Sequence, residues 1–375
     1  MLFSVQKSIL QSSLEVVSKA VGVSSTLDAL KGVLITVKDG LVTLTCSDTV
    51  TSIIDNFNVL NFENGSVLVD AKMLLEYIKR LNSNDILIES DSENNSIKLK
   101  CGKSSSVMMS MDTENFPSAF IPQEDIISID MIQEDFKDAL KHVVFALAQD
   151  ETRPILTGTY LGVKDGKLTA VGLDGYRLSV KSIAVDCEEN FSCVIPGKLS
   201  MDFLKILRDN DKNLVMKYSD KHKRVLFEIE NTTIISQTLI GDYIEYEKIM
   251  PKDNAIDVTL ETQPFLESLK RVELMSKQDK SRYGLVKLSI DAENKKIVIS
   301  SSNSLGQSQD EVEILDIRGE SLEIAYNVKY LLEVLNVIDE ESFIFKLNSP
   351  VSPAVIEKLE DKSFQALVLP VRLDS

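Results

Sequence analysis

The sequence predicts an α+β protein made of three similar units, each with two helices packed on antiparallel sheet. Three observations support this prediction: turn residues that recur at a fixed interval, helical apolar periodicity at matching places in each third of the chain, and alternating apolar runs between them. A chain of 375 residues is long enough for two or three domains of ordinary size. The recurrence favours three, which we place at residues 1–125, 126–252 and 253–375.

Hairpin turns mark the repeat. Residues 38–40 read Lys-Asp-Gly between the apolar runs 32–37 and 41–46, and the same three residues recur 126 positions later at 164–166. A third turn, at 291–294, lies a further 126 positions along. Acidic and glycine residues between alternating apolar runs favour β-hairpins. Self-similarity at one period indicates a repeat architecture.

Each unit contains two predicted helices. The first opens the unit and has apolar residues at helical spacing, as with Leu10, Leu14 and Val17. The second lies in the middle of the unit, and we expect these helices at 72–81, 199–207 and 328–335. Proline and polar residues near 116–122 and 251–254 are typical of linkers between units.

The N-terminus has no signal-peptide pattern, and no apolar run approaches about 18 residues. We therefore expect a cytosolic protein. Its four cysteines, Cys46, Cys101, Cys187 and Cys193, show no C-x-x-C spacing and are expected to be reduced.

Charge is distributed unevenly along the chain. The formal net charge is −17, which argues against nucleic acid as a partner unless positive charge is gathered locally. In the six predicted helical windows, Lys and Arg number 14 against 9 Asp and Glu, so acid is concentrated outside the helices. Two interpretations remain open. Lysine is a good helix former on any solvated face, or the helices line one surface that faces a polyanion.

Enzymatic chemistry finds little support. His142 and His222 lack neighbouring ligands at zinc-site spacing, and no phosphate-binding loop, dinucleotide turn or nucleophile elbow is present. Carboxylate pairs arise everywhere in so acidic a chain, so they are not informative alone. We expect no enzyme, no cofactor, no metal and no catalytic residue.

Four segments carry a resemblance to a known family. They are the Leu-Asp-Gly-Tyr-Arg-Leu segment 173–178, the Val-Ile-Pro-Gly-Lys approach to a helix at 194–198, the helix 326–336, and the C-terminal Leu-Val-Leu-Pro-Val-Arg-Leu segment 367–373. In order and spacing the chain resembles, over its whole length, the bacterial DNA polymerase III beta subunit, the processivity sliding clamp.

The resemblance implies three domains of the DNA clamp type in each chain and a head-to-tail homodimer that closes into a ring. Helices would line the hole and hold duplex DNA through its phosphates without reading sequence. The implied function is to tether the replicative polymerase for processive synthesis in the bacterial cytosol, at the nucleoid. The implied partners are DNA, a second copy of the chain, the polymerase III catalytic subunit, the clamp loader, and other polymerases and repair proteins.

The resemblance also implies specific residues. A pocket for short client peptides, between the second and third units, would be lined by Arg153, Leu156, Leu173, Gly175, Tyr176, Arg177, Leu178, Ile244, Lys248, Ile249, Tyr330, Val351, Pro353, Leu367, Val368, Leu369, Pro370, Val371 and Arg372. The arginines would reach polar groups of the peptide. Without the resemblance, residues 367–371 fit an ordinary buried terminal strand. DNA-facing residues would be Lys72, Arg80, Gln149 and Lys198, and the dimer interface would join Val107 and Met108 to Leu274 and Met275.

The chain departs from the family at several places. Ser24 and Ser25 replace an arginine-proline pair, residues 154–155 replace an aromatic pair, residues 242–244 replace a proline-containing turn, Ser106 replaces an interface aromatic, and Asp374 and Ser375 extend the end. We expect altered peptide preference and weaker ring closure. The alternative function is a protein-binding scaffold of the same fold that does not encircle DNA, and a hydrolase using acidic residues ranks third.

Overall fold

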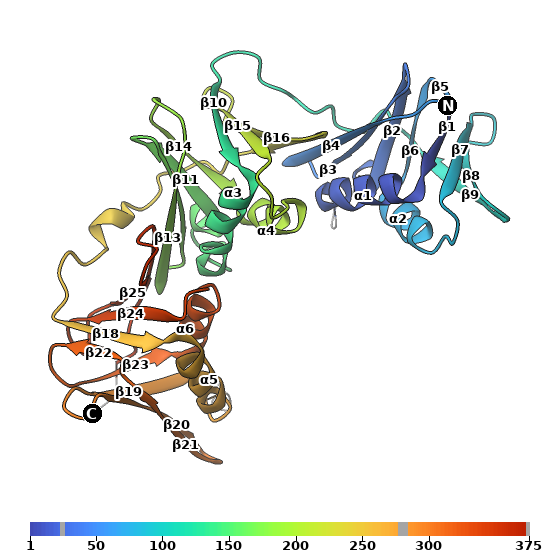
Figure 1. Ribbon diagram of the computed structural model, residues 1–375. Coiled ribbons are helices and arrows are strands. Elements are labelled where there is room, and N and C mark those ends of the chain that lie inside the picture. The colour runs from blue at the N-terminus through green and yellow to red at the C-terminus, as the bar shows by residue number, and fades with distance from the viewer. Residues whose placement is uncertain (23–26, 277–283, 373–375) are drawn as a thin grey trace. The chain divides into compact units, whose positions relative to one another are not determined.

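The computed structural model describes residues 1–22, 27–276 and 284–372 (Figure 1). The chain divides into two compact units. The first unit comprises residues 1–134 and 205–238, and the second comprises residues 135–204 and the chain from 239 onward. Within the described ranges, no helix is long and apolar enough to cross a membrane.

One series of elements occurs three times: a strand, a helix, three strands, a further strand, a second helix and three more strands. The first copy consists of β1 (Leu2–Gln6), α1 (Lys7–Val17), β2 (Gly32–Lys38), β3 (Leu41–Ser47), β4 (Thr51–Asn58), β5 (Phe62–Glu63), β6 (Gly65–Asp70), α2 (Ala71–Lys79), β7 (Asp85–Asp91), β8 (Ser96–Cys101) and β9 (Ser104–Met111). Its one addition to the series is the short strand β5.

The second copy follows the series without additional strands, and its elements are divided between the two units. It consists of β10 (Ile127–Ile132), α3 (Gln133–Lys141), β11 (Gly158–Lys164), β12 (Lys167–Leu173), β13 (Arg177–Ala184), β14 (Phe191–Pro196), α4 (Gly197–Ile206), β15 (Asn213–Ser219), β16 (Arg224–Ile229) and β17 (Thr232–Gln237). Short 3-10 helices η3 (Val144–Ala146) and η4 (Pro154–Thr157) lie between α3 and β11.

The third copy lies in the second unit and adds the short strand β22. It consists of β18 (Ile256–Glu261), α5 (Thr262–Glu273), β19 (Leu285–Asp291), β20 (Lys296–Asn303), β21 (Gly306–Glu313), β22 (Asp316–Arg318), β23 (Leu322–Asn327), α6 (Val328–Leu335), β24 (Ser342–Leu347), β25 (Ala354–Lys358) and β26 (Phe364–Val368). The 3-10 helix η5 (Tyr246–Lys248) precedes it. Three copies of two helices with antiparallel strands confirm the predicted α+β class.

Two antiparallel strand pairings join successive copies. In the first unit, one sheet has the order β10-β15-β16-β17-β4-β3-β2-β6-β9-β8-β7-β1-β5, in which β17 of the second copy pairs with β4 of the first. In the second unit, the order β14-β11-β12-β13-β26-β25-β24-β18-β22 pairs β13 with β26 of the third copy, beside a separate sheet β21-β20-β19-β23. The second pairing positions the candidate site.

The helices bury their apolar faces on the sheets. Leu10 and Leu14 of α1 are fully buried, as are Leu74 and Ile78 of α2, and α1 packs against α2. The Asp70 side chain caps α2 by accepting the Met73 N–H at 2.7 Å. The first two hairpin turns lie at the predicted residues, where Asp39, Gly40, Asp165 and Gly166 have the positive φ that aspartate and glycine tolerate. In the third turn the residue with positive φ is Lys295, just after the predicted range.

All four cysteines are free thiols, as expected, and Cys46, Cys101 and Cys193 are buried.

Candidate partner-binding site

The turn between β12 and β13 carries three of the predicted lining residues of the candidate site, at positions 175–177. Asp174 accepts hydrogen bonds from the backbone N–H groups of Tyr176 at 2.9 Å and Arg177 at 3.0 Å, and Gly175 between them has a φ of 87°. Such a turn requires an Asp side chain followed by a residue that tolerates a left-handed backbone. It leaves Tyr176 63% exposed while the neighbouring Arg177 is buried.

Arg177 links β13 to α6. Its guanidinium donates to Asp174 at 3.0 Å, to the Glu333 carboxylate and to the Phe145 carbonyl. It also lies 4.5 Å from the centre of the Tyr330 ring, within cation–π range. These contacts hold the Arg177 guanidinium within the chain, and its expected contact with a peptide stays a prediction.

The C-terminal segment runs beside this turn. β26 pairs with β13, so that Leu367 lies opposite Leu178 and Val368 opposite Arg177. Beyond the strand, the Leu369 N–H donates to the Tyr176 carbonyl at 2.9 Å. For Leu367 and Val368 the buried-strand interpretation is correct, whereas residues 369–370 are half-buried and 371–372 are exposed. In this segment, the side chains that reach the surface are therefore those of residues 369–372, after the end of β26.

An apolar cluster forms the floor of the site. Its buried members come from η4, β12, β13 and β26: Leu156, Val171, Leu173, Leu178 and Leu367. The partly buried side chains that pack on them are Ala148, Ile155, Tyr160, Val180, Tyr243, Ile244, Tyr246, Met250 and Leu369. Six of the predicted lining residues therefore meet in one place, four on the buried floor and two on its half-open surface.

Three tyrosines at the site were missed by the sequence reasoning. Tyr160 stacks on Tyr243 with ring centres 4.9 Å apart and contacts Tyr246 at 5.9 Å. Burial raises the pKa of Tyr243, and burial together with Glu247 and Tyr160 raises the pKa of Tyr246 to about 12. The rings of all three pack on the apolar cluster, and the hydroxyls of Tyr243 and Tyr246 are neutral at pH 7. The available signal was Tyr243, next to Ile244 in the altered 242–244 segment, and Tyr246, two residues after Ile244.

The other predicted lining residues are not members of this cluster. Tyr176 stacks on Tyr330 with ring centres 6.2 Å apart. Val351, 64% exposed, and Pro353 precede β25, whose Ala354 pairs with Val368. Exposed members of the predicted lining also include Arg153, Lys248, Ile249 and Arg372.

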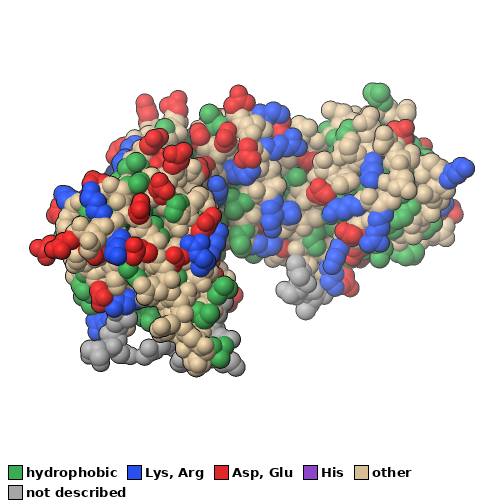
Figure 2. All heavy atoms as spheres, turned by 60° about the horizontal axis from the view of Figure 1, so that its bottom comes forward, with side chains coloured by type: hydrophobic (Ala, Val, Ile, Leu, Met, Phe, Trp, Pro, Cys, Tyr) green, Lys and Arg blue, Asp and Glu red, His purple; other side chains and the backbone are tan. Residues whose placement is uncertain are grey.

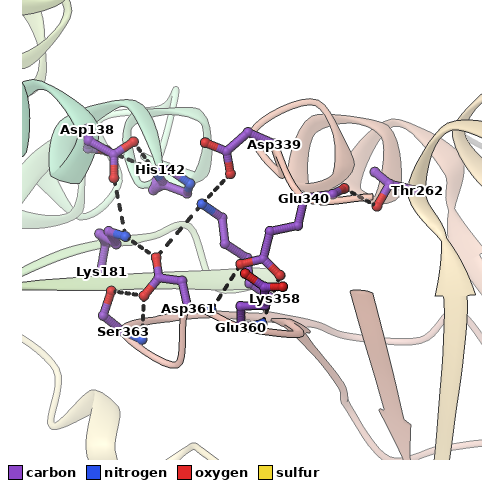
Figure 3. A network of polar contacts seen from close by, with 10 residues as sticks. All are labelled: Asp138, His142, Lys181, Thr262, Asp339, Glu340, Lys358, Glu360, Asp361 and Ser363. Atoms are coloured by element: carbon purple, nitrogen blue, oxygen red, sulfur yellow. Dashed lines mark hydrogen bonds and ion pairs between the residues drawn. The ribbon is translucent and has the colours of Figure 1, made fainter. Parts of the chain in front are cut away.

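A polar network fixes β13 against the third copy (Figure 3). Lys181 of β13 is 6% exposed, and its amine lies 3.2 Å from Asp138 of α3 and also contacts Asp361 before β26. Asp138 in turn contacts the buried His142 ring at 3.1 Å. Lys358 of β25, 3% exposed, contacts Asp339 at 2.6 Å. Strand pairing and this network together hold the two copies that build the site.

The predicted DNA-facing residues lie on or near helices. Lys72 and Lys198 are the second residues of α2 and α4, and both are exposed. Lys329 occupies the same place in α6, and the sequence reasoning did not single it out for DNA although the residues that follow it resemble those after Lys72. Arg80 contacts Glu76 at 3.5 Å, and Gln149 is exposed. Figure 2 shows basic and acidic side chains intermingled on one face.

The predicted dimer-interface residues differ in exposure. Val107 is 59% exposed and Leu274 is 66% exposed, whereas Met108 is only 7% exposed and packs within its own unit. Met109, which was not predicted, is 67% exposed on the same side of β9 as Val107. Met275 is half-buried.

The sequence departures can be located in part. Ile155, Tyr243 and Ile244 pack on the apolar floor. Ser106 is half-buried in β9 opposite Leu99. Ser24, Ser25, Asp374 and Ser375 lie outside the described residues.

Comparison with known proteins covers the whole chain. Three family models of the DNA polymerase III beta subunit match this chain. The model of the N-terminal domain matches residues 1–120, that of the central domain residues 130–245, and that of the C-terminal domain residues 247–372. The beta sliding clamp of Bacillus subtilis is 29% identical, with 99% of this chain and 100% of that protein covered. The Staphylococcus aureus clamp is 28% identical, with 99% of each covered.

Solved structures agree in fold. The sliding clamp crystal structure from Bacillus subtilis has a TM-score of 0.92 at 28% identity, covering 100% of both chains. The beta subunit structure from Thermotoga maritima also has a TM-score of 0.92, at 23% identity over 100% of both chains. Each of the three copies corresponds to one clamp domain, although our limits for the domains stay predictions. The chain belongs to the DNA polymerase III beta subunit family, the beta sliding clamps.

Proposed function

We propose that this protein is a sliding clamp that encircles duplex DNA as a head-to-tail homodimer and tethers the replicative polymerase. The observation that carries the proposal is the match of all three clamp domains, in order, over the whole chain. A ring holds DNA by topology rather than by affinity. A chain of net charge −17 suits that mode, because general adhesion to phosphate is weak.

Repeated lysines support a DNA-facing helical surface. Lys72, Lys198 and Lys329 occupy the second position of the second helix in each of the three copies. Two chains would present six such lysines at equivalent places. Contacts of this kind bind phosphate without reading bases, and salt screens them. Arg80 and Gln149 remain candidates for additional contacts.

The site in the second unit is proposed to take short extended peptides from the polymerase, the clamp loader, and other polymerases and repair proteins. The half-open surface of Ile244 and Leu369 over a buried aliphatic floor suits apolar peptide side chains. Arg153 and Arg372 at the exposed rim suit the peptide's polar groups. At the altered 242–244 segment, Tyr160, Tyr243 and Tyr246 would provide aromatic surface for the peptide.

The tether acts by effective concentration. A client held beside DNA rebinds faster than it escapes, so a weak peptide contact is enough for processive synthesis. The protein itself performs no chemistry in this scheme. We place it in the bacterial cytosol, at the nucleoid.

Retention on DNA tests the proposal. The clamp is loaded by the clamp loader of the same organism onto nicked circular DNA, and bound protein is measured by gel filtration before and after the circle is linearised. We expect retention on circles even when salt is raised, because encirclement does not depend on phosphate contacts, and rapid loss from linear DNA. Equal loss from both forms would contradict the clamp function and favour the scaffold alternative.

A further inference from the structure

The three tyrosines beside the candidate site form one aromatic surface, which we call the tyrosine cluster. Tyr160 lies in β11, whereas Tyr243 and Tyr246 lie in the segment that leads to the third copy. The rings of Tyr160 and Tyr243 are inclined by only 27°, and the ring of Tyr246 is inclined by 59° to that of Tyr160. All three side chains are half-buried, so part of each remains open to solvent.

The hydroxyl groups of the tyrosine cluster have few partners. The Tyr243 hydroxyl has one long hydrogen bond, of 3.4 Å, to the Val171 carbonyl. Over the ranges that the structure describes, the hydroxyls of Tyr160 and Tyr246 have no hydrogen-bond partner in the protein. A hydroxyl oxygen can accept a hydrogen bond from an ammonium or guanidinium group, and its proton can be donated to a carboxylate. The charges around the cluster therefore decide which kind of ligand it suits.

The segment that carries two of these tyrosines is acidic. Its acids are Asp242, Glu245 and Glu247, and its one base is Lys248. Glu245 and Lys248 contact each other, so their charges largely cancel. Asp242 and Glu247 are exposed and have no ion-pair partner among the described residues. The segment is left with two unpaired negative charges.

The charge of Glu247 acts on the tyrosine cluster. Burial is the largest cause of the raised pKa of Tyr246, and the Glu247 carboxylate adds to it because a negative charge opposes the loss of the phenolic proton. The same field attracts a cation and repels an anion. The faces of aromatic rings also attract cations, Arg and Lys side chains in particular. The rings, the hydroxyl oxygens and the carboxylate therefore all favour a positively charged ligand.

The tyrosine cluster shares its floor with the proposed peptide site. Tyr160 and Tyr246 pack on the same buried residues as Ile244 and Leu369, which form the half-open apolar surface. All of these residues belong to the second unit. Because alternate side chains of an extended peptide face the same side, one short peptide can contact both surfaces.

We propose that the tyrosine cluster and Glu247 bind a Lys or Arg side chain of the client peptide, next to the peptide's apolar side chains on the floor. This inference rests on the proposed peptide site and names the class of peptide that the site selects. The aliphatic stem of the basic side chain packs along the rings, while its charged head reaches Glu247 in water. Lys248 does not compete for the cluster, because Glu245 already holds it.

Peptide display tests the proposal. A library of random short peptides is selected on the immobilised full-length protein and, in parallel, on Glu247→Gln. Glu320→Gln is the matched control, because Glu320 is an exposed glutamate of the same unit that also has no ion-pair partner among the described residues. We expect the selected peptides to share a Lys or Arg at a fixed distance from their apolar residues. This preference should weaken on Glu247→Gln and persist on Glu320→Gln.

Calorimetry with a selected peptide measures the contribution of its basic residue. Replacing that residue by Met should weaken binding to the unaltered protein about five- to tenfold, because it removes an exposed ion pair and a cation–π contact. The loss should shrink to about two- to threefold on Glu247→Gln, which keeps the rings, and should keep its full size on Glu320→Gln. The net charge of −17 attracts basic peptides in general, and such attraction would respond equally to the two variants.

The outcomes separate this inference from the peptide site. Peptides that bind without a shared base, or a base whose replacement has the same effect on the unaltered protein and on both variants, overturn the inference and leave the peptide site in place. A library that yields no binding peptide overturns the peptide site and the inference together.

Discussion

Removing the Lys181 amine should weaken the joint between the second and third copies. Lys181 is 6% exposed and neutralises Asp138 and Asp361, whose side chains are 33% and 34% exposed. Breaking a fully buried ion pair costs about 3–5 kcal/mol. Because both carboxylates keep some contact with water, we expect Lys181→Met to lower the free energy of unfolding by about 2–3 kcal/mol at pH 7.

The effect should depend on pH. Burial opposes ionisation of Asp138, but hydrogen bonding and charge interaction with His142 and Lys181 outweigh it and lower the pKa from 3.8 to about 2. A carboxyl group with a lowered folded-state pKa stabilises the fold above its unfolded-state pKa, and this stabilisation is lost as pH falls through the folded-state pKa. The window therefore runs from about pH 4 down to about pH 2. After a discount for solvent exposure, the lowered pKa of Asp138 contributes about 1–2 kcal/mol to the free energy of unfolding at pH 7.

Hydrogen exchange at the amides of β13 and β26 measures the free energy of opening locally, which matters because a protein of several domains need not unfold in one step. We expect the difference between Lys181→Met and the unaltered protein to fall by about half between pH 7 and pH 3. The control is Lys287→Met, which removes a 2.8 Å contact with Glu323 between side chains that are 37% and 61% exposed. It should change stability by no more than about 0.5 kcal/mol. Equal effects for the two variants at pH 7, or no change in the difference at pH 3, would refute the reasoning.

Three further predictions concern the fold and the site. Gly172→Ala would place a Cβ 2.2 Å from the Val143 carbonyl oxygen, so it should lower the urea midpoint by an amount equivalent to about 1–3 kcal/mol, and an unchanged midpoint would count against this packing. Asp70→Ala removes the cap on the Met73 N–H and should cost about 1 kcal/mol, seen as faster exchange in α2, whereas unaltered exchange would mean that the cap contributes nothing. Tyr176→Ala should leave stability nearly unchanged because the ring is 63% exposed, yet weaken binding of a polymerase peptide about tenfold in calorimetry; full affinity would remove Tyr176 from the site.

Local sequence signals predicted the elements well because they depend on local physics. The Asp-Gly turns recur where the backbone needs a positive φ, and helical spacing of residues such as Leu10 and Leu14 reflects one buried face. The apolar residues of the candidate site were named from the sequence through the resemblance, which rests on short motifs. The tyrosine cluster was missed because Tyr160 and Tyr243 are distant in sequence and meet only after β11 and the 242–246 segment pack together.

The contacts of Arg177 within the chain could not be read from its motif. Its partner Phe145 lies in η3 of the same copy, and its partner Glu333 lies in α6 of the third copy. Only the packed structure shows that both contact the guanidinium. The Lys181 network has the same origin, since Asp138 and Asp361 approach it from opposite ends of the unit's sequence.

The sequence by itself determined the threefold order of helices and strands, because turn chemistry and apolar periodicity act over a few residues. Tertiary structure alone decided which edges are joined. Among the described strands, β4 pairs with β17 and β13 with β26, while β21 has no partner from another copy. Strand pairing depends on backbone groups that every residue carries. Register and partner are therefore set by how whole copies meet, which no local signal records.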